Sequence, residues 1–124
     1  MFEEVRDILM ELLDVTADEI IPESYLVRDL GMESIDFLEL AVALNQRFRV
    51  PVHDDTVFLR NLRLHSVQAR ESGRSIVDEL REHYGFLSDK RLEAIPADLE
   101  GGPVIQVQDL LSYVRWQMTN AKAA

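Results

Sequence analysis

The chain has 124 residues, 47% of them hydrophobic, which is enough for one modest core and too apolar for global disorder. Its formal net charge of −10 disfavours nucleic acid and anionic lipid and favours basic protein partners, while the absence of cysteine excludes disulfides and thiolate sites. The first residues lack the basic and apolar regions of a signal peptide, and no apolar run is long enough to span a bilayer. We therefore expect a cytoplasmic protein without stable membrane insertion.

The acidic side chains are concentrated in the first part of the chain. Residues 1–50 carry 12 acidic and 4 basic side chains, whereas residues 51–124 carry 11 acidic and 9 basic ones. Solubility alone would account for an acidic surface, but this concentration favours a recognition role for the N-terminal part.

A first helix is predicted from Phe2 to Asp14. Its apolar side chains recur at helical spacing and form one face, made by Val5, Ile8, Leu9, Leu12 and Leu13. The segment Thr16–Glu19 has the form of a capping box and predicts a short helical turn. Pro22 prevents a continuous helix beyond it, so a long loop is expected to follow.

A second helix is predicted from Ile35 to Arg47 or Phe48. Gly31 interrupts the preceding segment, and we expect Ser34 to be the N-cap of this helix. Two adjacent apolar stripes predict a central helix that packs on more than one side; they comprise Phe37, Leu40, Leu44 and Phe48, and Leu38, Ala41, Val42 and Asn45.

Further helices are predicted between residues 53 and 103. Asp54 or Asp55 is expected to cap the first of them, Ser75 a second that ends at Gly85, and Ser88 a third that ends before Pro96. The stretch is rich in apolar side chains and contains a basic run with Arg60, Arg63, Arg70 and Arg74 against the single acid Glu71. We expect it to be mostly folded.

The last helix is predicted from Val107 to Met118, with the residues from Thr119 onward frayed. Trp116 is expected to be a packing residue on this helix. The three histidines, His53, His65 and His83, are spread along the chain without the spacing of metal ligands, so no metal site is predicted. The sequence also lacks hydrolase triad, phosphate-loop and dinucleotide-binding patterns, and we do not expect an enzyme.

Residues 29–40 resemble the prosthetic-group attachment motif of acyl carrier proteins. The family's usual Asp-Ser-Leu is Glu33-Ser34-Ile35 here, and the resemblance continues through Asp36, Glu39 and Leu40. It extends upstream to the first helix and resumes at 107–110, which is similar to the start of the family's last helix. Together the similar parts cover about 2–52 and 104–119, whereas the middle is not covered.

The resemblance implies that a phosphopantetheinyl transferase attaches 4'-phosphopantetheine to the Ser34 hydroxyl. The terminal thiol of this arm would hold acyl groups as thioesters. The resemblance also implies a partner-binding surface for the basic docking faces of the transferase and of acyl-transferring and acyl-processing enzymes; it comprises Met32, Glu33, Ile35, Asp36 and Glu39. The family pattern is lost at 45–47, where Asn-Gln-Arg replaces acidic residues.

We therefore predict an all-α fold, an acyl-carrier-like helical bundle with additional helices inserted after the second helix. Residues 1–124 would form a single acyl-carrier-like domain with its core at about 2–52 and 104–119 and a helical insert at about 53–103. The expected function is a monomeric carrier for fatty-acid or related lipid biosynthesis. The alternatives are an aminoacyl, peptidyl or polyketide carrier and, in another class, an unmodified acidic helical adaptor. The insert would enclose a longer acyl chain, bind a partner, or do neither.

Overall fold

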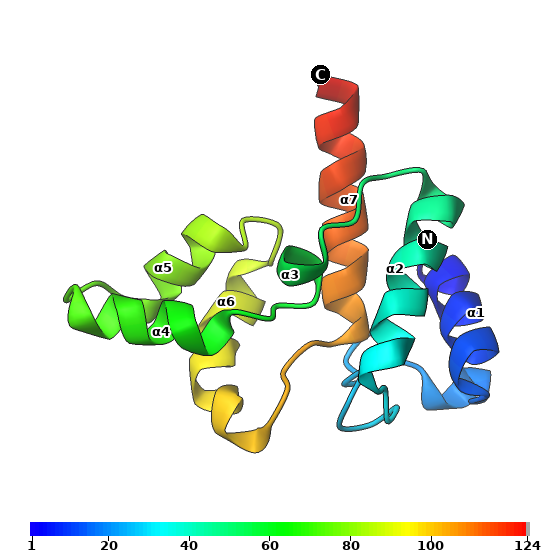
Figure 1. Cartoon of the computed structure of the whole chain (residues 1–124), viewed down its shortest axis with the longest axis horizontal. Coiled ribbons are helices and arrows are strands. Elements are labelled where there is room, and N and C mark those ends of the chain that lie inside the picture. The colour runs from blue at the N-terminus through cyan, green and yellow to red at the C-terminus, as the bar shows by residue number, and fades with distance from the viewer. Residues whose placement is uncertain (124) are drawn as a thin grey trace.

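The computed structural model describes residues 1–123, and regular secondary structure within them is entirely helical. Figure 1 shows the order and arrangement of these helices. The elements are α1 (Phe2–Leu13), the 3₁₀ turn η1 (Ala17–Glu19), α2 (Ser34–Phe48), α3 (Asp54–Val57), α4 (Leu62–Glu71), α5 (Ile76–His83), α6 (Asp89–Asp98), η2 (Leu99–Gly101) and α7 (Val107–Ala123).

Helices α1, α2 and α7 pack around one part of the hydrophobic core. The predicted apolar face of α1 points inward, with Val5 and Leu9 fully buried, and it meets Leu40 and Leu44 of α2 in the same core cluster. Burying a side chain of this size contributes roughly 1.5–3 kcal/mol relative to leaving it in water. In Figure 1, α7 stands between this pair and the helices that follow α2.

The long loop after α1 is fixed by hydrogen bonds near its start and in its middle. The Glu19 carboxylate accepts from the Thr16 backbone N–H at 2.7 Å, as the predicted capping box requires. Further along, the Leu26 N–H donates to the Ile105 carbonyl at 3.1 Å, and Val107 donates to Ser24 at 3.0 Å. These bonds connect the loop to the start of α7 and so determine where α2 begins.

The region between α2 and α7 is folded, as predicted, but its elements differ from those expected. The prediction that Asp54 or Asp55 caps the first helix was wrong, because His53 is the N-cap of α3, and α4 is a further helix that the sequence analysis did not predict. Helix α6 continues through Pro96, because the backbone N–H of Leu99 still donates to the Ile95 carbonyl beyond the missing proline donor. Helix α7 continues past the predicted end at Met118 to Ala123. Ala124, the last residue of the predicted frayed tail, lies outside the described residues.

An ion pair joins α6 to the start of α7 in the interior. The guanidinium of Arg91 donates from Nε to Asp109 Oδ1 at 2.9 Å and from Nη2 to Oδ2 at 3.0 Å, and it also reaches the Val104 carbonyl. Both side chains are buried. Because Asp109 also accepts from the Gln106 N–H, its carboxylate caps α7 and holds the insert at the same time.

Aromatic side chains make a second junction between the insert and α7. Phe86, in the turn before α6, lies edge-on to Tyr113 with ring centroids 5.2 Å apart and approaches Trp116 at 6.1 Å. Trp116 itself is 39% exposed, so it packs with one side only.

The predicted all-α fold with additional helices after α2 is confirmed. None of the helices in the described chain combines the length and the apolar character that crossing a bilayer requires.

Candidate functional site

Ser34 is the first residue of α2 and is exposed. The prediction that it caps the helix was wrong, because Glu33 occupies the N-cap position with extended backbone angles (φ −109°, ψ 172°). Gly31 makes the turn before it with φ 71°, a conformation that favours glycine. Its N–H donates to Val27 at 3.0 Å, which closes the loop and directs the serine to the surface.

Three carboxylates surround this helix start, as the sequence predicted. The Asp36 side chain accepts from the Glu33 backbone N–H at 2.8 Å, which stabilises the first turn, while Glu33 and Glu39 are exposed. A helix N-terminus favours negative charge nearby, and the same property favours a phosphate group on the adjacent hydroxyl.

An exposed apolar row runs along α2 beside the acids. Ile35, Leu38 and Val42 are 62%, 56% and 56% exposed, respectively, and lie at helical spacing on one side of α2. This corrects the expectation that Leu38 and Val42 lie in a wide buried arc. These three side chains do not contribute to the core, into which α2 packs Leu40 and Leu44. They are therefore available for contact with a partner.

Met32 does not belong to this surface. We expected it there, but its side chain is only 4% exposed and packs in the core cluster. The turn at Gly31 directs it inward, because the Met32 N–H donates back to the Leu26 carbonyl at 3.0 Å. Of the five residues predicted to bind partners, Glu33, Ile35, Asp36 and Glu39 remain at or near the surface.

A cavity of about 380 Å³ opens beside Ser34, between α2 and the insert. Its wall is largely apolar, with two arginines on one side; the lining residues include Phe37, Phe58, Leu62, Ile105, Arg60 and Arg63. Leu59 also lines it, and its backbone has the left-handed φ of 55°, which is rare for a bulky residue. The sequence showed these residues as apolar but gave no sign that they meet at the serine.

A network around Arg28 and Asp98 holds Gly102, one of the residues that line the cavity. Arg28 donates to the Asp98 carboxylate at 2.9 Å and to the Gly102 carbonyl at 2.8 Å, and the Tyr25 hydroxyl donates to the same carboxylate at 2.7 Å. Partial burial by itself would raise the pKa of Asp98, but the hydrogen bonds from Arg28 and Tyr25 outweigh it and lower the pKa.

Comparison with known proteins identifies the family. The family model described as "Phosphopantetheine attachment site" matches residues 3–63. An acyl carrier protein from Sulfurovum sp. (strain NBC37-1) is 38% identical over 55 residues, which are 44% of this chain and 73% of that protein. The chain belongs to the acyl carrier protein family.

Other acyl carrier proteins align over the same part of the chain. The one from Campylobacter fetus is 41% identical over 54 residues, which are 44% of this chain and 70% of that protein. The one from Nitratidesulfovibrio vulgaris is 43% identical over 53 residues, which are 43% of this chain and 70% of that protein. No solved structure matches the chain.

The family's prosthetic group is a covalently attached 4'-phosphopantetheine, and the chain is accordingly a phosphopantetheine carrier. The residues present fit this group. An exposed hydroxyl at a helix N-terminus tolerates a phosphodiester, and the adjoining cavity offers apolar surface for a flexible arm. The resemblance seen in residues 29–40 is thus confirmed at the level of the family.

One cluster was missed by the sequence analysis. His65 of α4 and His83 of α5 come together with Glu79, although their separation along the chain gave no sign of ligand spacing. The available signal was the pair Glu79 and His83, four residues apart on one helix, which places both side chains on the same face.

Proposed function

We propose that Ser34 bears the 4'-phosphopantetheine and that the chain carries acyl intermediates for fatty-acid or related lipid biosynthesis. The observation that carries this proposal is the apolar cavity with Ser34 in its lining. The bound arm supplies a terminal thiol, on which acyl groups are carried as thioesters. In this proposal the chain acts as a monomeric cytoplasmic carrier and performs no catalysis itself.

The role of Ser34 follows from its place on α2. Its hydroxyl oxygen would become the ester oxygen of the phosphodiester, next to the free N–H groups of the first helical turn. The lining arginines, Arg60 and Arg63, add positive charge on the cavity side of the serine. They would offset the repulsion that a new anion meets among Glu33, Asp36 and Glu39.

The cavity suits an alkyl cargo. Its wall includes Phe37 of α2 and Phe58 and Leu62 from the insert, so an acyl chain would lie between the two parts of the molecule. Moving each methylene from water into such surroundings is favourable by about 0.8 kcal/mol. An aminoacyl or peptidyl cargo would bring polar groups against the apolar part of this wall, away from Arg60 and Arg63, and burying such groups without hydrogen bonds is costly. The cavity therefore favours a fatty-acyl cargo.

The exposed face of α2 is the proposed docking surface for partner enzymes. The acidic Glu33, Asp36 and Glu39 would steer basic partners, and Ile35 with its apolar neighbours would supply a small desolvated contact. Partners of this kind are a phosphopantetheinyl transferase and acyl-transferring or acyl-processing enzymes. Complementary charge of this type speeds encounter and weakens as salt is added.

Intact mass spectrometry tests the attachment site. The full chain is incubated with coenzyme A and a phosphopantetheinyl transferase of broad specificity, beside a known carrier protein. We expect a mass gain of one phosphopantetheine that is lost in Ser34→Ala and retained in Ser72→Ala, the matched exposed serine at the end of α4. A wild-type chain that stays unmodified while the control carrier reacts would support the unmodified adaptor instead.

Acylation of the modified chain tests the cargo. Backbone amide spectra are recorded with an acetyl group and with a long saturated acyl group on the arm. We expect the long chain alone to shift amides of Phe37, Phe58 and Leu62, with α1 unaffected. The proposal that the acyl chain lies in the cavity is contradicted if the amide signals of α2 and the insert do not differ between the two cargoes.

A further inference from the structure

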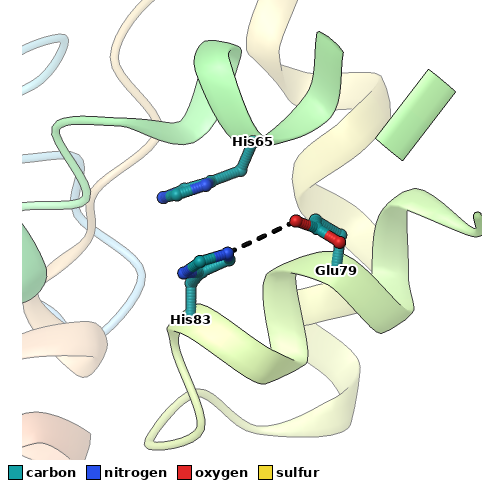
Figure 2. Close-up of side chains that lie close together, drawn as sticks. All are labelled: His65, Glu79 and His83. Atoms are coloured by element: carbon teal, nitrogen blue, oxygen red, sulfur yellow. Dashed lines mark hydrogen bonds and ion pairs between the residues drawn. The ribbon is translucent and has the colours of Figure 1, made fainter. Parts of the chain in front are cut away.

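The cluster missed by the sequence analysis, His65, Glu79 and His83, lies between α4 and α5, two neighbouring helices of the insert. Figure 2 shows His65 on α4 facing Glu79 and His83 on α5, with the three side chains converging between the helices. One ligand atom from each residue lies within 4.8 Å of the others. The His83 Nε2 is 3.3 Å from a Glu79 carboxylate oxygen.

Two members of the cluster have atoms that are available to a metal ion. The Nδ1 atom of His65 is buried and has no hydrogen-bond partner among the described residues, which leaves a lone pair or N–H unsatisfied. Glu79 is 8% exposed, and the guanidinium of Arg74 already supplies a counter-charge to it. Arg74 binds the Oε2 atom of Glu79 and leaves Oε1 directed toward His83.

We propose that His65, Glu79 and His83 form a binding site for a divalent first-row transition metal such as Zn²⁺. Two imidazoles and one carboxylate are ligands that zinc accepts, with a remaining position for water. The same set disfavours Mg²⁺ and Ca²⁺, which take oxygen ligands. Arg74 is the outer partner that orients the carboxylate.

The two imidazole rings would have to move before they could bind one metal ion together. The two imidazole rings are stacked, with centroids 3.7 Å apart and an angle of 16° between their planes. A metal ion lies close to the plane of each imidazole that binds it, so stacked rings cannot both bind one ion. Ligand atoms on a tetrahedral zinc lie roughly 3.4 Å apart, and the atoms here must close in to reach that separation.

His83 is the residue that can make this change. Its side chain is 39% exposed, whereas His65 lies partly buried under it against Tyr84. Rotation of the His83 ring would break the stack and aim both imidazoles at an ion beside Glu79.

Metal binding would fasten α4 to α5. The helices are otherwise joined by the turn at Ser72 and Gly73, and they pack against each other. The ion would stabilise this hairpin of the insert without touching Ser34 or the cavity residues. The proposal is therefore independent of the acyl-carrier function.

Calorimetric titration of the untagged full chain with Zn²⁺ at about pH 7.5 tests the site. We expect the wild type to bind one Zn²⁺ ion per chain and no Mg²⁺. His83→Gln and Glu79→Gln should each lower the affinity for Zn²⁺ at least tenfold. The matched controls are His53→Gln, the histidine outside the cluster, and Glu82→Gln, the other carboxylate on Arg74. Bound zinc should also raise the melting temperature by several degrees in wild type and not in His83→Gln.

Three outcomes would overturn the proposal. These are no zinc binding in the wild type, equal binding in His83→Gln and Glu79→Gln, or an equal loss in the two control variants. His65→Gln is measured as well, but His83→Gln decides the result if His65→Gln does not fold, because His83 is the more exposed. The imidazole proton signals give a second readout, since separating the stacked rings must shift both sets.

Discussion

Residues 1–52 and the insert at 53–103 differ in charge and in their relation to other carriers. The first part has 12 acidic and 4 basic side chains, holds Ser34 and lies almost wholly within the family match at 3–63. The insert has 10 acidic and 7 basic side chains, and its helices from α4 to α6 lie almost entirely outside that match. Nevertheless, both parts line the cavity beside Ser34. The part shared with other carriers presents the serine, whereas the added part completes the cavity wall. Under the proposed function, attachment and cargo would therefore depend on different regions of the chain.

The largest expected effect comes from the ion pair that holds the two parts together. Arg91→Met removes the partner of Asp109, whose side chain is fully buried, and leaves that carboxylate without its counter-charge. Such a loss costs about 3–5 kcal/mol of unfolding free energy. Urea denaturation at neutral pH measures it, with the exposed neighbour Lys90→Met as the control. Equal stability of the two variants would show that the insert is not held through this pair.

A matched pair of glycines tests whether both parts unfold together. Gly31 precedes α2 and Gly73 follows α4; their φ angles are 71° and 70°, and nothing lies within 4 Å of an added Cβ at either site. Alanine at each should cost about 1–2 kcal/mol through backbone strain alone. In one cooperative unit both variants shift a single transition equally. A separate early transition in Gly73→Ala only would contradict the prediction that residues 1–124 form a single domain, which stays a prediction until then.

A smaller, pH-dependent effect is expected in the network around Arg28 and Asp98. Asp98 has a lowered pKa in the folded chain, so its contribution to stability is present above the unfolded value of 3.8 and is lost as the pH falls through the folded one. Asp98→Asn should therefore cost about 1 kcal/mol at pH 7, with the difference from wild type vanishing in acid. Thermal melts across pH measure this. The control is Glu93→Gln, which removes an exposed acid of the same helix; an equal pH trend in both variants would contradict the prediction.

The smallest effect is kinetic and concerns the acidic face of α2. Glu39→Gln should lower the transferase kcat/KM by about threefold to tenfold at low salt, because it removes a steering charge. Added salt screens the same charge, so at about 0.5 M NaCl wild type and variant should converge. Glu11→Gln, an exposed acid on α1, is the control. An equal loss in both variants would indicate that net charge matters and not the α2 face.

Local patterns in the sequence predicted the helices well and the boundaries less well. Apolar spacing found α1, and capping residues such as Ser75 and Ser88 found the starts of α5 and α6. The presence of Pro96 led to the wrong prediction that this helix ends before it. A proline removes only one backbone donor, and the hydrogen bond from Leu99 to Ile95 continues the helix beyond it. The N-cap of α2 is Glu33 and not Ser34, because the Asp36 carboxylate accepts a hydrogen bond from the backbone N–H of Glu33.

The site was predictable only where its residues are adjacent in the chain. Ser34 and its acids follow one another, and the family resemblance pointed to them. The cavity joins Phe37 to Leu62 and Ile105, and the histidine cluster joins residues on two helices; both depend on packing that spacing does not encode. Met32 and Leu38 show the same limit, since helical periodicity identifies a face but not which neighbour covers it.

Trp116 has a practical consequence for all of these experiments. It is the single tryptophan of the sequence, and its half-exposed ring lies on α7 within 6.1 Å of Phe86 from the insert. If the insert leaves α7, water replaces the Phe86 ring at the indole, and the emission maximum shifts to the red. The chain therefore carries a built-in optical reporter of docking between its two parts, which needs no label and can be read on the timescale of mixing.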